Sequence, residues 1–432
     1  MSTHTDIEGR RAAPAASARR RVAITGVGVV SPLGTGAKAF WSGLLAGRSG
    51  IGPIRGFDTS RHQVHFAGEV RDFDPRDWVA AKEAKRLDRF CHFALAAADM
   101  AVTDARFTAP DPQRVATVFA SGIGGTQTME EGVDALRSAG PDGVSSMLVP
   151  AAIPNMAAGQ IALHFGFGGP NICPVTACAS SADAVGWAFR LVRDGYADAC
   201  LAGGAEASVR EPMLAGFANL RALSKRNTAP EEASRPFDGD RDGFVLAEGA
   251  AALMLEPLDV ALARGARVYA EIRGYGQSCD AYHSTAPDPV GGGPARAIRS
   301  ALDDAGLDPE DVDYLNAHGT STRLMDAIET KAVKRALGPH AHRVAISSTK
   351  SMTGHMMGAT GAAEAIACAM AIHTGHVPPT INQHVPDPEC DLDYVPNAAR
   401  AAAVDVALSN SMGFGGHNVC LAFATPTTTG DR

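Results

Sequence analysis

The chain has 432 residues, of which 45% are hydrophobic and 20% charged, and its formal net charge is −8. This composition is typical of an ordinary globular protein, and the length is too great for one simple core. The acidic balance argues against general nucleic-acid binding, which needs a basic surface, and no apolar run approaches the ~20 residues of a transmembrane helix.

Residues 1–20 read MSTHTDIEGRRAAPAASARR and are rich in alanine, arginine and serine. They lack the apolar core of a secretory signal, and Asp6 and Glu8 argue against a transit peptide. We therefore expect a disordered N-terminal extension and a cytoplasmic location. The eight cysteines lie mostly in apolar runs and show no zinc-like spacing, which favours free thiols over disulfides.

A β-branched stretch at 20–34 and apolar stretches at 114–125 and 197–208 each run into glycines, and residues 92–105 form an alanine-rich helical stretch. Such strands alternating with helices predict a parallel sheet covered by helices on both faces. The GxG of Gly26 and Gly28 also fits a dinucleotide-binding turn. Pro32, however, stands where the phosphate-binding helix would begin, so that alternative is weak.

The same order of strand, glycine turn, small-residue loop, buried helix and strand starts again near residue 268. The matching stretches of the second round are 266–278, 311–322, 344–375 and 404–424. No low-complexity linker separates the two rounds, so we expect them to share an interface. The sequence thus predicts two similar halves, 21–267 and 268–425, followed by a flexible tail at 426–432.

Cys178 lies in the stretch PVTACASSADAVGWAFRLVRDG, directly before a helical pattern that is apolar on every face except at Asp183. Ser180 or Ser181 would cap this buried helix, and Gly195 would end it. The partial positive charge at the start of the helix would lower the pKa of the Cys178 thiol, which favours a nucleophile. The alternative is an inert buried cysteine, the interpretation we give to the other seven, including the nearby Cys173.

Two histidines occupy the matching loops of the second half. His318 follows an apolar strand in NAHGTST, and His355 precedes the helix that mirrors the Cys178 helix. A lone loop histidine is usually structural, but two at equivalent strand ends favour function. Lys350 lies on the same loop as His355, and Glu364 interrupts an apolar helix, where a buried carboxylate needs a partner such as Lys350.

The stretch SNSMGFGGHN at 409–418 places one aromatic residue, Phe414, among glycines. Glycines let backbone N–H groups point into a site, as an oxyanion hole requires. The alternative is a tight turn with an exposed phenylalanine, which would be unusual between glycines.

In this order and spacing, VTACAS, NAHGTST, STKSMTGH and NSMGFGGHN resemble the β-ketoacyl-acyl-carrier-protein synthases, closest to the elongating type II enzymes. They are also similar to the ketosynthase subunits of type II polyketide synthases. The resemblance runs from about residue 20 to residue 425. It implies an α/β, thiolase-like, five-layered αβαβα fold made of two duplicated halves, which is normally dimeric.

The resemblance also implies a decarboxylative Claisen condensation. Cys178 would hold an acyl chain as a thioester, and His318 and His355 would donate hydrogen bonds to the thioester carbonyl of malonyl-acyl carrier protein. Lys350 would order and polarise the site through Glu364. No cofactor and no metal is implied, because 4′-phosphopantetheine arrives on the carrier protein.

Further roles follow from family positions alone. The backbone N–H groups of Cys178 and Phe414, in the loop with Gly413 and Gly415, would form the oxyanion hole, and Phe414 would be the gate between acyl pocket and malonyl entry. The remaining assignments are Thr320, Thr322 and Thr285 for the pantetheine arm, Ile123 and Met412 for the acyl pocket, and Lys82, Lys85, Arg86, Arg221 and Lys225 for docking the acidic carrier protein.

Several residues depart from the usual family pattern and leave acyl-chain specificity open. Met412 replaces a common phenylalanine, Ser181 replaces a common glycine, and Arg323 and Met325 follow the threonine motif. Residues 141–143 read PDG where relatives often carry basic residues, so carrier docking is also open.

Four functions remain as alternatives. The first is fatty acid elongation, and the second is the ketosynthase subunit of a type II polyketide synthase acting with a chain-length partner. An inactive dimer partner is disfavoured by the complete Cys-His-His-Lys set, and a thiolase by the absence of a cysteine in GFGGHN. A Cys-His hydrolase would need water in an apolar tunnel. The expected partners are an acyl carrier protein and either a second copy or a related chain-length subunit, with no nucleic acid and no membrane.

Overall fold

The computed structural model describes residues 19–427. Most of the predicted N-terminal extension and of the predicted tail (residues 1–18 and 428–432) therefore lie outside the described residues. Within residues 19–427, no helix has the length and apolar character needed to cross a bilayer.

The first half of the chain contains strands β1–β8 and helices α1–α9. The strands are β1 (Val22–Ser31), β2 (Gly34–Thr35), β3 (Gly52–Pro53), β4 (Phe66–Ala67), β5 (Val115–Ala120), β6 (Asn171–Ile172), β7 (Ala199–Glu206) and β8 (Gly249–Pro257). The helices are α1 (Ala37–Leu45), α2 (Ala81–Ala84), α3 (Arg89–Asp104), α4 (Thr126–Ala139), α5 (Leu148–Ala152), α6 (Met156–Phe165), α7 (Ser180–Arg193), α8 (Glu211–Asn219) and α9 (Leu258–Ala263).

The second half contains strands β9–β15 and helices α10–α13. The strands are β9 (Ala270–Cys279), β10 (Tyr314–Asn316), β11 (Ala345–Ser347), β12 (His376–Val377), β13 (Arg400–Ala401), β14 (Val406–Gly413) and β15 (His417–Ala424). The helices are α10 (Gly292–Ala305), α11 (Arg323–Leu337), α12 (Lys350–Thr353) and α13 (Thr360–Thr374).

One mixed sheet of 11 strands runs through both halves in the order β11-β10-β14-β15-β9-β1-β8-β7-β5-β6, with β2 attached to β1. The halves meet where β1 pairs with β9. The predicted parallel pairing holds for β5 with β6 and β7 and for β10 with β11 and β14. It is wrong for the central strands, which are antiparallel. A strand that is buried on both faces is a continuous apolar run whether its neighbours are parallel or antiparallel, so composition does not distinguish the two kinds of pairing.

The glycines of β1 serve packing rather than dinucleotide binding. A Cβ on Gly26 would lie 2.1 Å from the carbonyl oxygen of Ala101, and one on Gly28 would lie 2.0 Å from that of Ala97. Both carbonyls belong to α3, which lies directly on the strand. Since both glycines are inside β1 and not in a turn before a helix, the dinucleotide alternative fails.

The second half repeats this contact. In β9, Cβ atoms on Gly274 and Gly276 would lie 2.1 Å and 2.0 Å from the carbonyl oxygens of Ala301 and Ala297 in α10. The same two-glycine spacing thus brings a helix onto the same kind of strand in each half. The duplication is visible at the level of single backbone contacts.

Helices α7 and α13 are the pseudo-equivalent central pair. Each follows a 3-10 turn whose first residue has a left-handed backbone, Ala177 with φ 52° and Met357 with φ 48°. The helices touch closely, since a Cβ on Gly361 would lie 2.6 Å from the backbone nitrogen of Ala182. The prediction that the Cys178 helix is apolar and buried all round is wrong at Trp187, whose side chain is 40% exposed.

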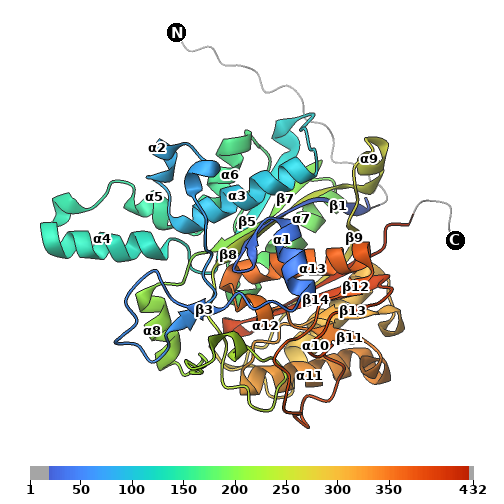
Figure 1. Cartoon of the computed structure of the whole chain (residues 1–432). Helices are drawn as coiled ribbons and strands as arrows, with labels where there is room; N and C mark the ends of the chain where they lie inside the picture. The colour runs from blue at the N-terminus through green and yellow to red at the C-terminus, as the bar shows by residue number, and fades with distance from the viewer. Residues whose placement is uncertain (1–18, 428–432) are drawn as a thin grey trace.

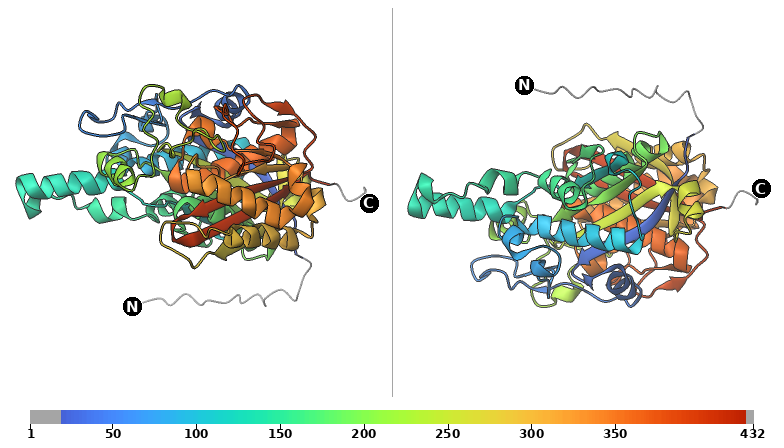
Figure 2. Two further views of the ribbon diagram at one scale, coloured as in Figure 1. Left: turned by 90° about the horizontal axis from the view of Figure 1, so that it is seen from below. Right: turned by 90° about the horizontal axis from the view of Figure 1, so that it is seen from above.

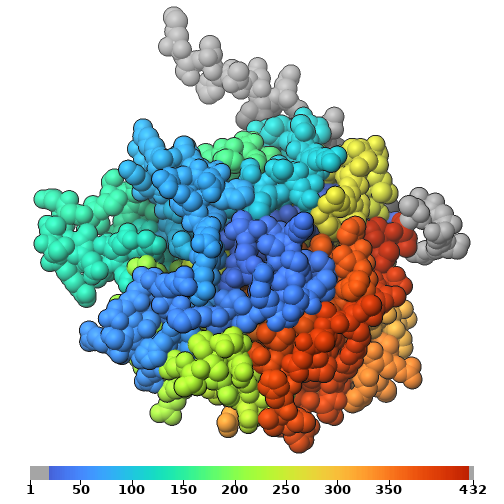
Figure 3. Space-filling model, viewed as in Figure 1, coloured from blue at the N-terminus to red at the C-terminus, as the bar shows by residue number. Residues whose placement is uncertain are grey.

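The views agree on the overall arrangement. In Figure 1 helix α3 covers one face of the sheet and helices α10 and α11 lie on the other side of the molecule. Helix α4 projects from the body as an arm, which both views of Figure 2 show. On the face in Figure 3, the surface of the N-terminal residues in blue adjoins that of the C-terminal residues in orange and red.

The glycine contacts generate a prediction about stability. Gly28→Val and Gly276→Val should each lower the free energy of unfolding by about 3 kcal/mol, because the added side chain would push a helix off its strand. Urea unfolding followed by circular dichroism measures this. Gly216→Ala in α8 is the matched control, since nothing lies within 4 Å of a Cβ there. Equal stability of Gly28→Val and the control would contradict the packing role.

Candidate active site

Four stretches that are far apart in the sequence meet at one hollow of about 370 Å³. Cys178 comes from the turn before α7, His318 from the end of β10, His355 from the loop between α12 and α13, and Phe414 from the turn between β14 and β15. Both halves of the fold therefore contribute to a single site.

The Cys178 turn is fixed by short local hydrogen bonds. The Ser180 hydroxyl donates to the carbonyl oxygen of Ala177 at 2.6 Å and accepts the backbone N–H of Thr176 at 2.9 Å. Ser180 is thus the first residue of α7 rather than its N-cap, which is Ala179. The other predicted cap, Ser181, instead accepts the backbone N–H of Ala362 at 2.9 Å and joins α7 to α13. The predicted capping role is wrong for both serines because their hydroxyls have these nearer partners.

The expectation of a lowered thiol pKa is also wrong. Burial raises the pKa of Cys178 to about 12, and the negative charge of Glu206 adds to the rise. The positive charge of Lys350 and the backbone N–H groups of Phe414 and Cys178 oppose it without cancelling it. Desolvation of a charged thiolate outweighs these opposing contributions, so the resting state at neutral pH is the thiol.

The two histidine rings face each other nearly at right angles, with centroids 5.5 Å apart. Burial, and next the positive charge of Lys350, hold the pKa of both imidazoles well below 6.5. Nδ1 of His355 lies 3.1 Å from the Thr360 hydroxyl, while its Nε2 is buried with no hydrogen-bond partner among residues 19–427. At neutral pH both rings are uncharged, and each can donate one N–H.

A buried ion pair lies behind the histidines. Lys350 Nζ is 2.7 Å from Glu364 Oε1, and both side chains are 1% exposed. Burial raises the pKa of Glu364, and the Lys350 ammonium opposes that rise. The sequence expectation that these two residues lie together therefore matches their placement.

The glycine loop lies directly on the nucleophile turn. A Cβ on Gly413 would lie 2.6 Å from the Thr176 carbonyl oxygen and 3.2 Å from the Cys178 nitrogen. Phe414 is half-buried and lines the hollow. Gly415, with φ 83°, donates its N–H to the carbonyl oxygen of Ser284 at 2.7 Å, so that group points away from the hollow.

The predicted pantetheine residues Thr285, Thr320 and Thr322 line the same hollow, as do Met412 and Arg221. The hydroxyls of Thr320 and Thr322 are 3.1 Å apart. The departures Arg323 and Met325 also line it.

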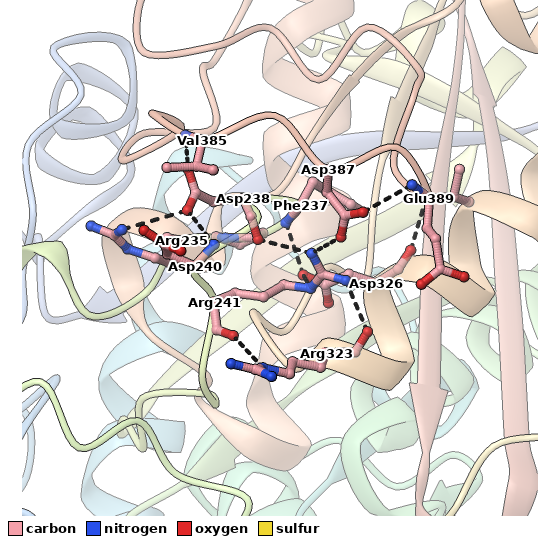
Figure 4. Close-up of polar contacts among 12 residues, drawn as sticks. Arg235, Phe237, Asp238, Asp240, Arg241, Arg323, Asp326, Val385, Asp387 and Glu389 are labelled. Carbon is pink, nitrogen blue, oxygen red and sulfur yellow. Dashed lines mark hydrogen bonds and ion pairs between the residues drawn. The ribbon is translucent and has the colours of Figure 1, made fainter.

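A buried arginine holds the threonine loop in place (Figure 4). Arg241 donates to the carbonyl oxygens of Thr322 at 3.1 Å and Arg323 at 2.9 Å, and its Nε is 3.6 Å from Asp326. Asp326 in turn accepts the backbone N–H of Phe237 at 2.9 Å, and burial raises its pKa to about 7. This network ties the segment before β8 to the loop that lines the hollow.

Other predicted site residues lie elsewhere. Ile123 lines a second hollow, between α4 and α8. Lys82 is exposed on α2, and Lys85 and Arg86 border a groove beside α4 and α5. Lys225 is exposed and its ammonium donates to Gln63 Oε1 at 2.6 Å. Cys173 is half-buried and does not line the Cys178 hollow.

The carboxylates that hold the loops are absent from the sequence predictions. Glu329 accepts the backbone N–H groups of His318 at 2.8 Å and Gly319 at 2.7 Å, and Asn410 donates to it at 2.6 Å. The available signal was its position in α11, where Glu329 shares the apolar face with Val333 and Leu337. No group of three potential metal ligands occurs among residues 19–427.

Known proteins are similar to this chain over most of its length. The family models for the β-ketoacyl synthase N-terminal and C-terminal domains match residues 19–261 and 269–384. The 3-oxoacyl-[acyl-carrier-protein] synthase 2 of Synechocystis sp. (strain ATCC 27184 / PCC 6803 / Kazusa) is 54% identical over 407 residues, which is 94% of this chain and 98% of that protein.

Two solved structures are also similar. The ishigamide ketosynthase/chain length factor has a TM-score of 0.89 and 40% identity, covering 95% of this chain and 100% of that one. The second structure is a type II polyketide synthase acyl-carrier protein in complex with its ketosynthase bound to the hexaketide. Its TM-score is 0.88 and its identity 36%, and the match covers 95% of this chain and 100% of that one. The thiolase-like fold expected from the motifs is confirmed, and this chain belongs to the β-ketoacyl synthase family.

Proposed function

We propose that this chain is a 3-oxoacyl-[acyl-carrier-protein] synthase of type II. It condenses malonyl-acyl carrier protein with an acyl chain held on Cys178 and gives 3-oxoacyl-acyl carrier protein in fatty acid elongation. The observation that carries the proposal is the meeting of a buried thiol, two uncharged imidazoles and backbone N–H donors in one hollow.

In the first step the Cys178 sulfur attacks the thioester carbonyl of an acyl carrier protein. The backbone N–H groups of Cys178 and Phe414 stabilise the oxygen that becomes negative. The carrier thiol leaves with the proton that Cys178 gives up, so the exchange is balanced. Because the resting sulfur is a thiol, the ammonium of Lys350 and these N–H groups assist the transfer by stabilising the thiolate as it forms.

In the second step His318 and His355 donate to the thioester carbonyl of malonyl-acyl carrier protein. The bond to the carboxylate breaks, CO₂ leaves, and the electron pair forms an enolate held by the two N–H groups. Neutral imidazoles suit this task, because the step needs donors and no strong base. If the Thr360 hydroxyl donates to Nδ1 of His355, the N–H lies on Nε2, the buried atom without a partner.

The enolate carbon then attacks the acyl-Cys178 carbonyl. A carbon–carbon bond forms, the carbon–sulfur bond breaks, and the sulfur leaves as a thiolate that takes up one proton. The same two backbone N–H groups serve both attacks, since the acyl carbonyl occupies the same place each time.

A second function has its own support. Two of the similar solved structures are named as a ketosynthase/chain length factor and a type II polyketide ketosynthase. Met412, Arg323 and Met325, which depart from the usual pattern of elongating enzymes, all line the Cys178 hollow. A ketosynthase subunit acting with a chain-length partner is therefore the alternative.

An acyl carrier protein is the proposed partner at the mouth of the hollow. Arg221 lines the hollow and is exposed, and Lys225 follows on the same loop. Their positive charge would meet the acidic carrier. Lys82, Lys85 and Arg86 remain candidates for a second docking contact beside α2.

A homologous chain, most simply a second copy, is the proposed partner on the face formed by α4, α5, α6 and β6. Val149 and Leu163 are 65% and 75% exposed there, and helix α4 buries none of its residues. Strand β6 ends the sheet order, so its outer edge bears no strand among the described residues. An open strand edge beside exposed apolar side chains is typical of an interface between subunits.

The first prediction for this function uses Cys178→Ala. Wild-type protein should form an acyl adduct on Cys178 and extend saturated acyl-carrier proteins by one two-carbon unit when malonyl-carrier protein is added. The variant should form no adduct and lose condensation by at least about 10³-fold, because no other group can carry the chain. Protein mass and carrier-bound products are followed together.

Outcomes of the same assay separate the alternatives. A strong preference for polyene or poly-keto chains, or activity only with an added partner subunit, would favour the polyketide function. An identical adduct in wild type and Cys178→Ala would sink the assignment of the nucleophile.

The raised thiol pKa predicts a pH dependence. Below a pKa of about 12 the thiolate fraction of Cys178 should rise about tenfold per pH unit, so alkylation by iodoacetamide should accelerate steadily from about pH 6.5 to 9. Peptide mass mapping measures the alkylated fraction of Cys178, and the exposed Cys279 serves as an internal reference. A plateau below about pH 8 would instead mean that the helix terminus dominates.

The subunit face also gives a prediction. Val149→Glu combined with Leu163→Glu should shift the protein toward monomers in sedimentation analysis, because buried charges would oppose association. Leu262→Glu, on the 46%-exposed Leu262 of α9, is the matched control. A wild-type monomer, or a double variant with unchanged mass, would rule out this face.

A further inference from the structure

Glu206 is a buried carboxylate that none of the catalytic steps uses as a donor, acceptor or nucleophile, although its charge contributes to the raised pKa of Cys178. It is the last residue of β7 and is 0% exposed. Its Oε1 accepts the Ser121 hydroxyl at 3.0 Å and the Ile123 N–H at 3.2 Å. Its Oε2 accepts the N–H groups of Gly122 at 2.9 Å and Gly358 at 3.0 Å.

These four partners come from both halves of the chain. Three belong to the turn between β5 and α4, and the fourth belongs to the 3-10 turn before α13. All four are uncharged donors, so the ionised carboxylate fits them and both oxygens must accept. Burial raises the pKa of Glu206 to about 7, and these hydrogen bonds oppose the rise.

The two turns are built to reach this carboxylate. A Cβ on Gly358 would lie 2.3 Å from the Gly122 nitrogen, and a Cβ on Gly122 would lie 2.9 Å from Glu206 Oε2. Only glycine at both positions lets two backbone N–H groups approach one oxygen. Glu206 therefore joins the turns at their point of closest contact.

Each joined turn carries a large side chain at a different hollow. Next to Gly358, Met357 lines the hollow of about 370 Å³ that contains Cys178. Next to Gly122, Ile123 lines the hollow of about 610 Å³ between α4 and α8. The contact between the two turns therefore lies between the two hollows.

We propose that Glu206 is a positioning residue that fixes the turn carrying Ile123 against the turn carrying Met357, and so sets which acyl chains on Cys178 enter the hollow between α4 and α8. The inference rests on the proposed acyl transfer to Cys178. It adds a residue that acts on chain length through the backbone, without touching the reacting atoms.

The test compares Glu206→Gln with wild type. Glutamine has the same shape, but its NH₂ group must face at least one N–H that needs an acceptor, so hydrogen bonds are lost on one side. kcat/KM is measured with hexanoyl- and myristoyl-carrier protein, and the Cys178 adduct is followed by mass. Removal of the Glu206 charge also acts on the Cys178 thiol, but it does so for both chains alike. The readout is therefore the myristoyl-to-hexanoyl ratio, which should change by about tenfold.

Three variants complete the design. Glu206→Asp keeps the charge and should restore part of the wild-type ratio, and Ser121→Ala removes one donor and should shift the ratio less, in the same direction as Glu206→Gln. Glu256→Gln is the matched control: this carboxylate is 2% exposed, pairs with Arg264 and lies at the opposite end of the neighbouring strand β8. It should lower the melting temperature without moving the ratio.

One result would overturn the inference: an unchanged myristoyl-to-hexanoyl ratio in a folded Glu206→Gln or Ser121→Ala protein, whether the two turnovers are kept or fall equally. If Glu206→Gln does not fold, the myristoyl-to-hexanoyl ratios of Ser121→Ala and Glu206→Asp test the inference instead. A wild-type protein that forms no Cys178 adduct with either chain would instead refute the proposed function, which keeps the two failures apart.

Discussion

The ammonium group of Lys350, buried with Glu364, is the interaction on which the chemistry of the hollow depends. Its charge helps to keep His318 and His355 uncharged, and it opposes the rise in the thiol pKa of Cys178. A buried charge is tolerated only with a partner, and Glu364 supplies one at 2.7 Å. Apolar surroundings would destabilise an unpaired cation, but they are compatible with the Lys350 ammonium because Glu364 pairs with it. Its charge acts on Cys178, His318 and His355 at once.

The duplicated fold places that charge where both halves meet. Cys178 precedes α7, and Lys350, His355 and Glu364 come from the equivalent region around α13. The two helices can touch because small residues face each other, as Gly361 does against Ala182. One half contributes the nucleophile and the other the donors, so the site exists only when the halves pack together.

Much of this arrangement could be predicted from the sequence. The strands and the second round of the pattern follow from glycine turns and apolar runs, whereas the joint placement of Cys178, His318, His355 and Phe414 follows from the family resemblance. Carboxylates such as Glu206 and Glu329 could not be assigned, because their partners are backbone N–H groups of distant turns, which carry no sequence signal. The direction of the central strands was hidden by their uniform apolar character.

The prediction of a lowered pKa for the Cys178 thiol was wrong for a different reason. The raised pKa of Cys178 results from burial and Glu206 on one side and from Lys350 and two backbone N–H groups on the other. Sequence shows that these groups are present but not how completely water is excluded, and water exclusion decides the sign. The predicted capping by Ser180 and Ser181 was wrong for a similar reason. The hydrogen-bond partner of a serine hydroxyl, such as the Ala362 N–H for Ser181, depends on how the helices pack.

The pairing of β1 has a consequence for how the chain is made. This strand is among the first described residues. Apart from the two-residue strand β2, it pairs with β8 and β9, and the Thr25 hydroxyl donates to Glu256, 231 residues later. At about 5–20 residues per second, a ribosome needs roughly ten to fifty seconds to deliver those partners. During that time a fully buried apolar strand is exposed outside the tunnel. The nascent chain should therefore depend on chaperones that shield β1 until the middle of the protein has been synthesised.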